Sequence, residues 1–209
     1  MTIEAHKSDN RRYALTLLGA FFIALAWSAI HPHDYFTWML EVMPAIIGAG
    51  VLISTYQKFR LTRLAYLLIC VHMIILMIGG HYTYAEVPLL NWFRDAFGFS
   101  RNHYDRLGHF AQGFVPAIIV REILLRTSPL KQGKWLFFIV TSICLAISAS
   151  YELIEWFVAV TTGTAADSFL GTQGDVWDSQ WDMFFALCGA IISQVLLKGL
   201  HDRELEEII

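Results

Sequence analysis

Apolar residues run through this chain in long stretches, separated by short polar or charged segments. Six of these stretches approach the roughly 20 residues that a helix needs to cross the hydrocarbon core of a bilayer. The expected spans cover residues 13–30, 36–55, 64–82, 107–125, 135–161 and 177–200. The pattern predicts an all-α integral membrane bundle of about six transmembrane helices, folded as a single polytopic domain over residues 1–209.

The second outer connection is too apolar for a plain linker. Residues 88–99 read PLLNWFRDAFGF, with Arg94 and Asp95 among aromatic and aliphatic side chains. This composition suits a short interfacial or re-entrant helix at the membrane surface. The aromatic residues near the same surface are expected to form a belt at the lipid headgroups; they are Tyr82, Tyr84, Trp92, Trp156, Trp177 and Trp181.

Composition supports a membrane protein and excludes several functions. Hydrophobic residues make up 56% of the chain and charged residues 16%, whereas soluble domains have about a quarter charged residues. The net charge of -3 offers no basic surface for a nucleic acid. Rossmann, Walker and nucleophile-elbow patterns are absent from the sequence, which argues against nucleotide binding and serine-hydrolase chemistry.

Basic residues are distributed unevenly between the two sides that six spans would create. Of the 15 Lys and Arg residues, only Arg94, Arg101 and Arg106 fall on the side opposite the N-terminus. The positive-inside rule therefore predicts that both termini are cytoplasmic, in a bacterial inner membrane. The loops at 31–35 and 162–176, and the longer connection at 83–106, would face the other side.

Ionisable residues inside the spans are costly to bury, so each is a candidate for function. At about 1.5 Å per helical residue, those of several spans fall in one layer near the outer surface. Spacing also puts them on common helix faces, because residues three or four apart are neighbours on a helix. The pairs are Asp105 with His109, Glu152 with Glu155, and Asp178 with Asp182, and His81 lies at a similar depth.

This layer is strongly acidic. Seven carboxylates, including Glu41 and Asp175, stand against Arg101 and Arg106. A divalent metal with oxygen and imidazole ligands would compensate for this excess, as in di-metal helix bundles. The candidate ligands are His81, Asp105, His109, Glu152, Glu155, Asp178 and Asp182. Glu152, Glu155 and Asp182 are the candidate catalytic groups, of which one would serve as general base.

Two other interpretations of the same residues remain open. The acids and histidines could form a structural network of hydrogen bonds and salt bridges, or they could carry protons or ions. A conducting path predicts polar residues that continue into the inner halves of the spans, and those halves are nearly all apolar. His72, alone in the middle of its span, is expected to be hydrogen-bonded within the bundle.

Four stretches carry a resemblance to known proteins over the whole chain. GGHYTYAEVPLLNW from Gly79, NHYDRLGHFAQGFVPA from Asn102, YELIEW from Tyr151 and GTQGDVWDSQWDM from Gly171 resemble the YjdF family of uncharacterised bacterial inner-membrane proteins. This resemblance implies a location and a set of site residues, and it implies no reaction.

A more distant resemblance concerns the order of the polar pairs. Asp105 and His109, then the acid pair, then Asp178 and Asp182 are similar to VanZ-like membrane proteins, which are linked to glycopeptide-antibiotic tolerance. The usual forms there are Asp-Lys-x-x-His, Glu-x-x-Gln and Asp-x-x-x-Asn. This chain departs from them at Arg106, Glu155 and Asp182. The last two changes make the site more acidic, which favours a cation and weakens any transfer of antibiotic tolerance.

The leading hypothesis from the sequence is a metal-dependent intramembrane hydrolase or transferase. It would bind a divalent metal in the outer leaflet and act on a lipid or a lipid-linked envelope substrate. The first alternative is a small proton- or cation-coupled transporter, and the second is a non-catalytic membrane scaffold. Membrane lipids are the expected partners in each case, and neither nucleic acid nor nucleotide is expected.

Overall fold

Long helices account for most of the protein. The computed structural model describes residues 3–163 and 167–208, and within them it contains helices and no strand. The long helices are α1 (Ile3–Ser28), α2 (Tyr35–Thr55), α3 (Arg63–Tyr82), α5 (Tyr104–Thr127), α6 (Lys134–Thr162) and α8 (Asp178–Glu206). The short ones are the 3-10 helix η1 (Tyr84–Glu86), α4 (Pro88–Phe97) and α7 (Asp167–Leu170). The predicted all-α fold is confirmed.

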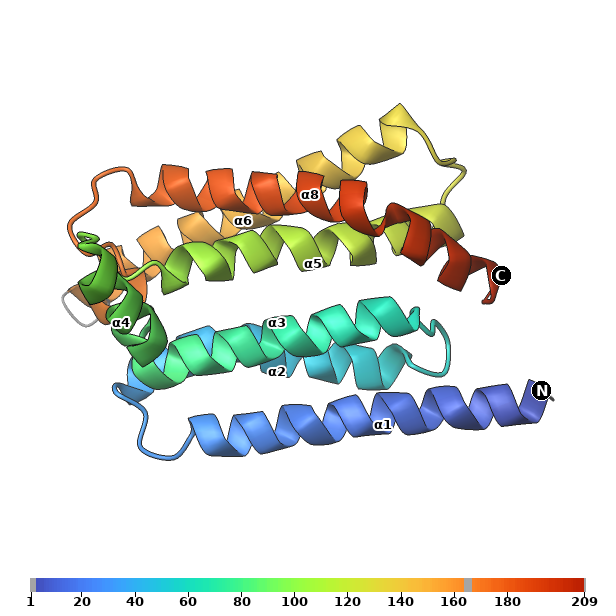
Figure 1. Ribbon diagram of the computed structural model, residues 1–209, viewed down its shortest axis with the longest axis horizontal. Helices are drawn as coiled ribbons and strands as arrows, with labels where there is room; N and C mark the ends of the chain where they lie inside the picture. The colour runs from blue at the N-terminus through green and yellow to red at the C-terminus, as the bar shows by residue number, and fades with distance from the viewer. Residues whose placement is uncertain (1–2, 164–166, 209) are drawn as a thin grey trace.

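Five of the described helices, α2, α3, α5, α6 and α8, are long and apolar enough to cross a membrane. Helix α1 is longer than the predicted span 13–30, because it begins at Ile3 and includes the charged residues Lys7, Asp9, Arg11 and Arg12. These charges keep α1 out of the group of five, so the sixth span stays a prediction. In Figure 1, α1 lies alongside α2 and α3, and its 26 residues make it longer than α2 with 21 and α3 with 20.

The helices form two groups that meet along α3 and α5 (Figure 1). One group contains α1, α2 and α3, and the other contains α5, α6 and α8. Both chain ends lie at one end of the bundle, whereas α4 and the connection that leads into α8 lie at the other. We call these the terminal end and the α4 end. The buried apolar side chains of the first group continue across to Val115 and Ile118 of α5.

Helices α5 and α8 approach so closely that their backbones touch. A Cβ atom at Gly113 would collide with the carbonyl oxygen of Ala186, and one at Gly189 would collide with the carbonyl oxygen of Phe110. Small residues allow this approach in membrane bundles, where packing replaces the hydrophobic effect between helices. The contact fixes the polar residues of α5 and α8 relative to one another at the α4 end.

Local sequence signals explain where the helices of the first group begin. The Asp34 side chain caps α2 by accepting a hydrogen bond from the backbone N–H of Thr37 at 2.7 Å. The Thr62 hydroxyl accepts one from Ala65 in the same way at the start of α3. Such caps satisfy N–H groups that have no partner within the helix. Both helices therefore begin within a residue of the predicted starts at 36 and 64.

The expected short helix in the second outer connection is α4. None of its residues is buried; Leu90 packs against the bundle, whereas Leu89, Trp92 and Phe97 are each more than 60% exposed. It lies across the α4 end of the bundle (Figure 1). An exposed aromatic face on a short amphipathic helix is typical of a helix at the lipid–water boundary.

Candidate metal and acid–base site

The site is built around His109, which lies in the second turn of α5. Asp105, one turn earlier, points its Oδ1 atom at Nε2 of His109 from 3.4 Å. The other ring nitrogen, Nδ1, lies 3.1 Å from the side-chain oxygen of Gln112. The ring is therefore held between Gln112 on its Nδ1 side and Asp105 on its Nε2 side. A partner of this kind fixes the tautomer and orientation of metal-binding histidines.

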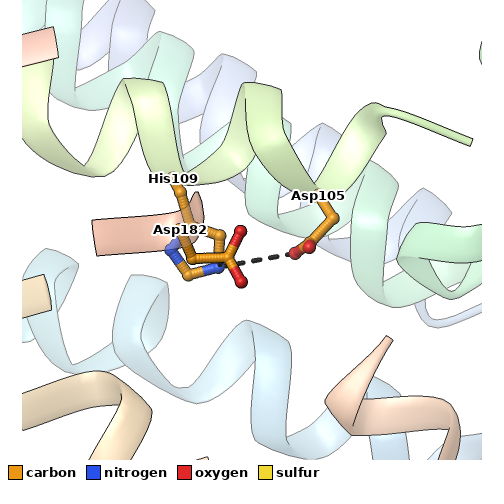
Figure 2. Close-up of side chains that lie close together, drawn as sticks. All are labelled: Asp105, His109 and Asp182. Carbon is orange, nitrogen blue, oxygen red and sulfur yellow. Dashed lines mark ion pairs between the residues drawn. The ribbon is translucent and has the colours of Figure 1, made fainter. Parts of the chain in front are cut away.

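Asp182 of α8 completes one side of the imidazole. Its Oδ1 atom is 3.9 Å from Nε2 of His109, and Figure 2 shows its carboxylate beside the edge of the ring that faces Asp105. One ligand atom from each of Asp105, His109 and Asp182 lies within 4.8 Å of the others, and all three residues are buried. Ligand atoms on opposite sides of a cation, each at about 2.0–2.5 Å, have a similar separation.

Helix α6 supplies carboxylates on the other side of the ring. The Oε1 atom of Glu152 lies 3.8 Å from Nδ1 of His109. His109, Glu152 and Glu155 form a second group of potential ligand atoms within 4.8 Å of one another. The sequence spacing of three residues places both glutamates on one face of α6, as expected, and that face is turned toward α5.

Two carboxylate oxygens of this site have no hydrogen-bond partner among the described residues. They are Oδ1 of Asp182 and Oε1 of Glu152, which are the two atoms that face the ring nitrogens of His109. Asp182 is only 3% exposed and Glu152 9%. A buried carboxylate oxygen without a hydrogen-bond partner is costly, and a proton on it, a bound cation or a protonated His109 ring at 3.8–3.9 Å would each lower that cost.

Arg101 separates Asp178 from this group. The buried guanidinium group donates to Asp178, to Asp105 at 3.2 Å and to the carbonyl oxygen of Gly171 at 3.3 Å. Burial alone lowers the pKa of Arg101, but the hydrogen bond to Asp178 and the nearby carboxylates raise its pKa above the ordinary value. Arg106 similarly binds Asp175 at 3.1 Å. Asp178 is therefore engaged by an arginine, and neither group of potential ligands includes it.

His81, a predicted ligand, lies at a different junction. Its Nδ1 atom is 3.0 Å from the carbonyl oxygen of Ser28, and its ring packs against Trp27 with centroids 4.5 Å apart. Among the described residues it belongs to neither group of potential ligands. His81 was predicted as a ligand from its depth along the span, but the face of α3 that carries it is turned toward α1.

A cavity of about 200 Å³ adjoins the site and lies between the two helix groups. Its polar wall includes His109, Asp105 and Glu155 together with Glu41 of α2. Its remaining lining includes apolar residues of α2, α3, α5 and α6, namely Pro44, Leu76, Pro116 and Ile147. The cavity therefore presents titratable groups and hydrocarbon to the same volume.

Sequence reasoning placed Glu41 in the right layer but left it out of the candidate site. Glu41 is buried, and the hydroxyl groups of Tyr84 and Tyr151 are its hydrogen-bond partners. The prediction that Tyr84 belongs to the aromatic belt is wrong. Its ring is buried against Gly79 and Gly108, where a Cβ atom would collide with it. Gly79 and Gly108 could have indicated this burial in the sequence, because the absence of two side chains leaves space for one aromatic ring.

The remaining members of the expected belt differ from Tyr84. Trp92, Trp156 and Trp177 are each more than 60% exposed.

His72 was expected to be hydrogen-bonded within the bundle. It lines the inner part of the cavity instead, and its Nε2 atom is buried without a hydrogen-bond partner among the described residues.

Comparison with known proteins places these features in a family. Residues 13–203 match the family described as "Predicted membrane protein (DUF2238)". The chain belongs to this family. It is also 50% identical over 192 residues to the inner membrane protein YjdF of Escherichia coli (strain K12), which covers 92% of this chain and 90% of that protein. No solved structure matches the chain.

The family membership confirms a multi-pass membrane protein with transmembrane helices, and its relative is a protein of the bacterial inner membrane. Neither the family description nor the name of this relative specifies a substrate or a reaction.

Proposed function

We propose that this protein binds a divalent metal ion between Asp105, His109 and Asp182, and acts on an amphiphilic substrate in the adjoining cavity. The observation that carries the proposal is Oδ1 of Asp182, which has no hydrogen-bond partner among the described residues and faces Nε2 of His109. A cation at this point would satisfy both atoms and would also offset the charge of Asp105. Carboxylate oxygens suit magnesium and manganese, and an imidazole nitrogen suits zinc.

The second side of the imidazole supplies acid–base chemistry in this proposal. Nδ1 of His109 lies 3.1 Å from the side-chain oxygen of Gln112 and 3.8 Å from Oε1 of Glu152, and this glutamate oxygen has no hydrogen-bond partner among the described residues. Glu152 and Glu155 are therefore available to accept or hold a proton beside the cavity. A bound divalent ion would polarise an oxygen of the substrate, as a Lewis acid does. Together these groups fit a hydrolase or transferase better than a scaffold, in which buried polar atoms are satisfied.

The shape of the cavity supports a lipid or a lipid-linked substrate. The polar groups of Glu41, His109 and Glu155 would face a headgroup, while Leu76 and Ile147 would face hydrocarbon. We propose that the site lies in the outer leaflet, with both termini cytoplasmic. This orientation is supported by the two chain ends at one end of the bundle (Figure 1) and by the excess of Lys and Arg there. In this arrangement α1 is the sixth span.

The experiment that tests the metal site is elemental mass spectrometry of purified protein after exposure to magnesium, manganese or zinc and removal of the excess. We expect close to one ion per chain in the wild type and a large loss in Asp182→Asn, which keeps the shape of the side chain. Asp95→Asn is the matched control, since Asp95 lies exposed on α4 and pairs with Arg94. Equal metal content in wild type and Asp182→Asn would overturn the proposal.

A second measurement shows whether Glu152 acts as a metal ligand or as a general base. Glu152→Gln should retain the metal, because Glu152 lies on the Nδ1 side of the ring. It should lose turnover when reconstituted protein is incubated with bacterial lipid extract and products are followed by mass spectrometry. Loss of metal in Glu152→Gln would instead make Glu152 a ligand.

A proton path is the second candidate function, and one observation favours it. His72, with its unpartnered Nε2, extends the titratable lining of the cavity from the site into the middle of α3. Proton flux into liposomes, reported by a pH-sensitive dye under an imposed membrane potential, distinguishes this function. Flux that disappears in His72→Leu would support a path, whereas absence of flux in the wild type would exclude it.

A further inference from the structure

A second cavity, of about 270 Å³, lies at the terminal end of the bundle, far from the acidic site. It is a groove with α1 and α2 as its walls and α3 as its floor. Its middle is lined by aliphatic and aromatic side chains, including Leu18, Phe21, Leu52 and Ile69. Nothing in the proposed metal chemistry uses this groove.

The groove opens to the bilayer and follows the helix axes. Leu15 and Ile53, one on each wall, are 55% and 54% exposed. The α1 wall extends from Arg11 to Phe21, and ten residues of helix rise about 15 Å. This is half of a hydrocarbon core of about 30 Å, so the groove matches the depth of one leaflet.

The mouth of the groove is polar and basic. Arg11 and Gln57 line it, and Lys58 follows Gln57 directly in the chain. In the described part of the chain Arg11 has no carboxylate partner. Three acidic residues of the terminal end line a neighbouring cavity instead; they are Asp9, Glu204 and Glu207.

One buried polar atom at the mouth has no hydrogen-bond partner among the described residues. It is the hydroxyl of Tyr56, which lines the groove. The guanidinium group of Arg60 lies 5.0 Å from the centre of the Tyr56 ring, but Arg60 lines the neighbouring acidic cavity. The Tyr56 hydroxyl and the Arg11 guanidinium group are both donors, and they call for an acceptor that carries negative charge.

We propose that this groove is a binding site for one anionic phospholipid. An acyl chain lies along Leu18 and Ile53, and the phosphate accepts hydrogen bonds from Arg11 and from the Tyr56 hydroxyl. The apolar wall matches hydrocarbon, and the basic mouth selects a negatively charged headgroup over a zwitterionic one. The site is separate from the acidic centre, so it stands or fails independently of the metal proposal.

Native mass spectrometry of the detergent-solubilised full chain tests the proposal, with phosphatidylglycerol and phosphatidylcholine of identical acyl chains as probes. A basic side chain beside an anionic headgroup favours binding about fivefold. We therefore expect the wild type to bind phosphatidylglycerol at least about fivefold more tightly, and Arg11→Gln to lose most of this preference. Arg12→Gln is the matched control, because Arg12 is exposed and does not line the groove.

A steric variant tests the acyl-chain part. Ala14 lines the groove, so Ala14→Trp should abolish adducts of both lipids. Gly19→Trp, on a part of α1 where a Cβ atom meets nothing within 4 Å, should leave them unchanged. Equal binding of the two lipids by the wild type, or equal effects of Arg11→Gln and Arg12→Gln, would overturn the proposal. The comparison of Arg11→Gln with Arg12→Gln tests the preference for the anionic lipid even if Ala14→Trp fails to fold.

Discussion

Asp182 on α8 and His109 on α5 face each other across the closest helix contact of the bundle, with Oδ1 of the aspartate 3.9 Å from Nε2 of the histidine. The aspartate oxygen has no hydrogen-bond partner among the described residues. The two residues are 73 positions apart in the chain, and the backbone contact between Gly113 and Ala186 lies one turn further along both helices. The geometry of the site therefore depends on glycines that carry no functional group.

Gly113→Ala should separate α5 from α8. A Cβ atom at this position collides with a backbone carbonyl group, which cannot rotate away as a side chain could. Overpacking typically costs about 1–3 kcal/mol, and a backbone collision belongs at the upper end. We expect a lower thermal unfolding midpoint in detergent together with weaker metal binding. Gly19→Ala, where a Cβ atom meets nothing within 4 Å, is the control and should be neutral or stabilising.

Arg101→Gln should destabilise the α4 end. The substitution leaves Asp178 and Asp105 buried without their shared guanidinium group. Removing one partner of a buried ion pair costs about 3–5 kcal/mol. Arg94→Gln provides the comparison, because Arg94 pairs with Asp95 on the exposed α4 and should leave the unfolding midpoint unchanged. Similar midpoints for the two variants would contradict the structural role of Arg101.

Asp34→Ala should shorten or loosen the start of α2, whereas Asp34→Asn should preserve the cap. Loss of a helix N-cap costs about 1 kcal/mol. The hydrogen bond from the Thr37 backbone lowers the pKa of Asp34 below its ordinary value. The stabilisation by its charged form is therefore fully present above the unfolded-state pKa and disappears as the pH falls through the folded-state value. The difference in unfolding midpoint between wild type and Asp34→Ala should therefore shrink in strong acid to the part that a neutral acceptor retains. A difference that stays constant down to that pH would argue against a contribution from the charged cap.

Metal binding should weaken as the pH falls. Carboxylate and imidazole groups must release their protons to bind a cation, so protons compete with the metal at Asp105, His109 and Asp182. Titrations of the purified protein with manganese or zinc should give a lower apparent affinity at about pH 5 than at about pH 7.5. Binding that does not change with pH would indicate a site made of other groups.

The proposed orientation can be tested with single cysteines. Phe99, beyond α4, is 49% exposed, and Lys131 lies exposed in the connection between α5 and α6 at the terminal end. A membrane-impermeant thiol reagent applied to spheroplasts should label Phe99→Cys, and it should label Lys131→Cys only after lysis. The wild type provides the background from the native cysteines, of which Cys70 and Cys144 are buried and Cys188 is partly exposed. The reverse labelling would invert the topology.

The helices themselves could be predicted because their signal is local. Long apolar runs set the five helices that can cross a membrane, and Asp34 and Thr62 mark the starts of two of them. The short helix α4 followed from its proline, its aromatic residues and its charges. A helix satisfies its own backbone hydrogen bonds, so its limits depend little on what surrounds it.

The partners of each polar residue could not be predicted, because depth and spacing fix a layer and a face but leave the rotation of each helix open. His81 and Glu41 show the consequence: both lie in the expected layer, yet α3 turns His81 toward Ser28 and α2 turns Glu41 toward the cavity. Asp178 and Asp182 share one face of α8, but Arg101 binds only the first of them.

The sequence by itself determined the membrane-spanning helices, the acidic layer and the pairs within each helix, since these depend on hydrophobic length and on the 3.6-residue helical repeat. The tertiary structure alone decided that Asp182 and Glu152 meet His109 from opposite sides, and that Tyr84 is buried. The physical reason is that helix packing is set by shape at a few positions distant in sequence. In this protein Gly113 and Gly189 set the approach of α5 to α8, and Gly79 and Gly108 make room for Tyr84.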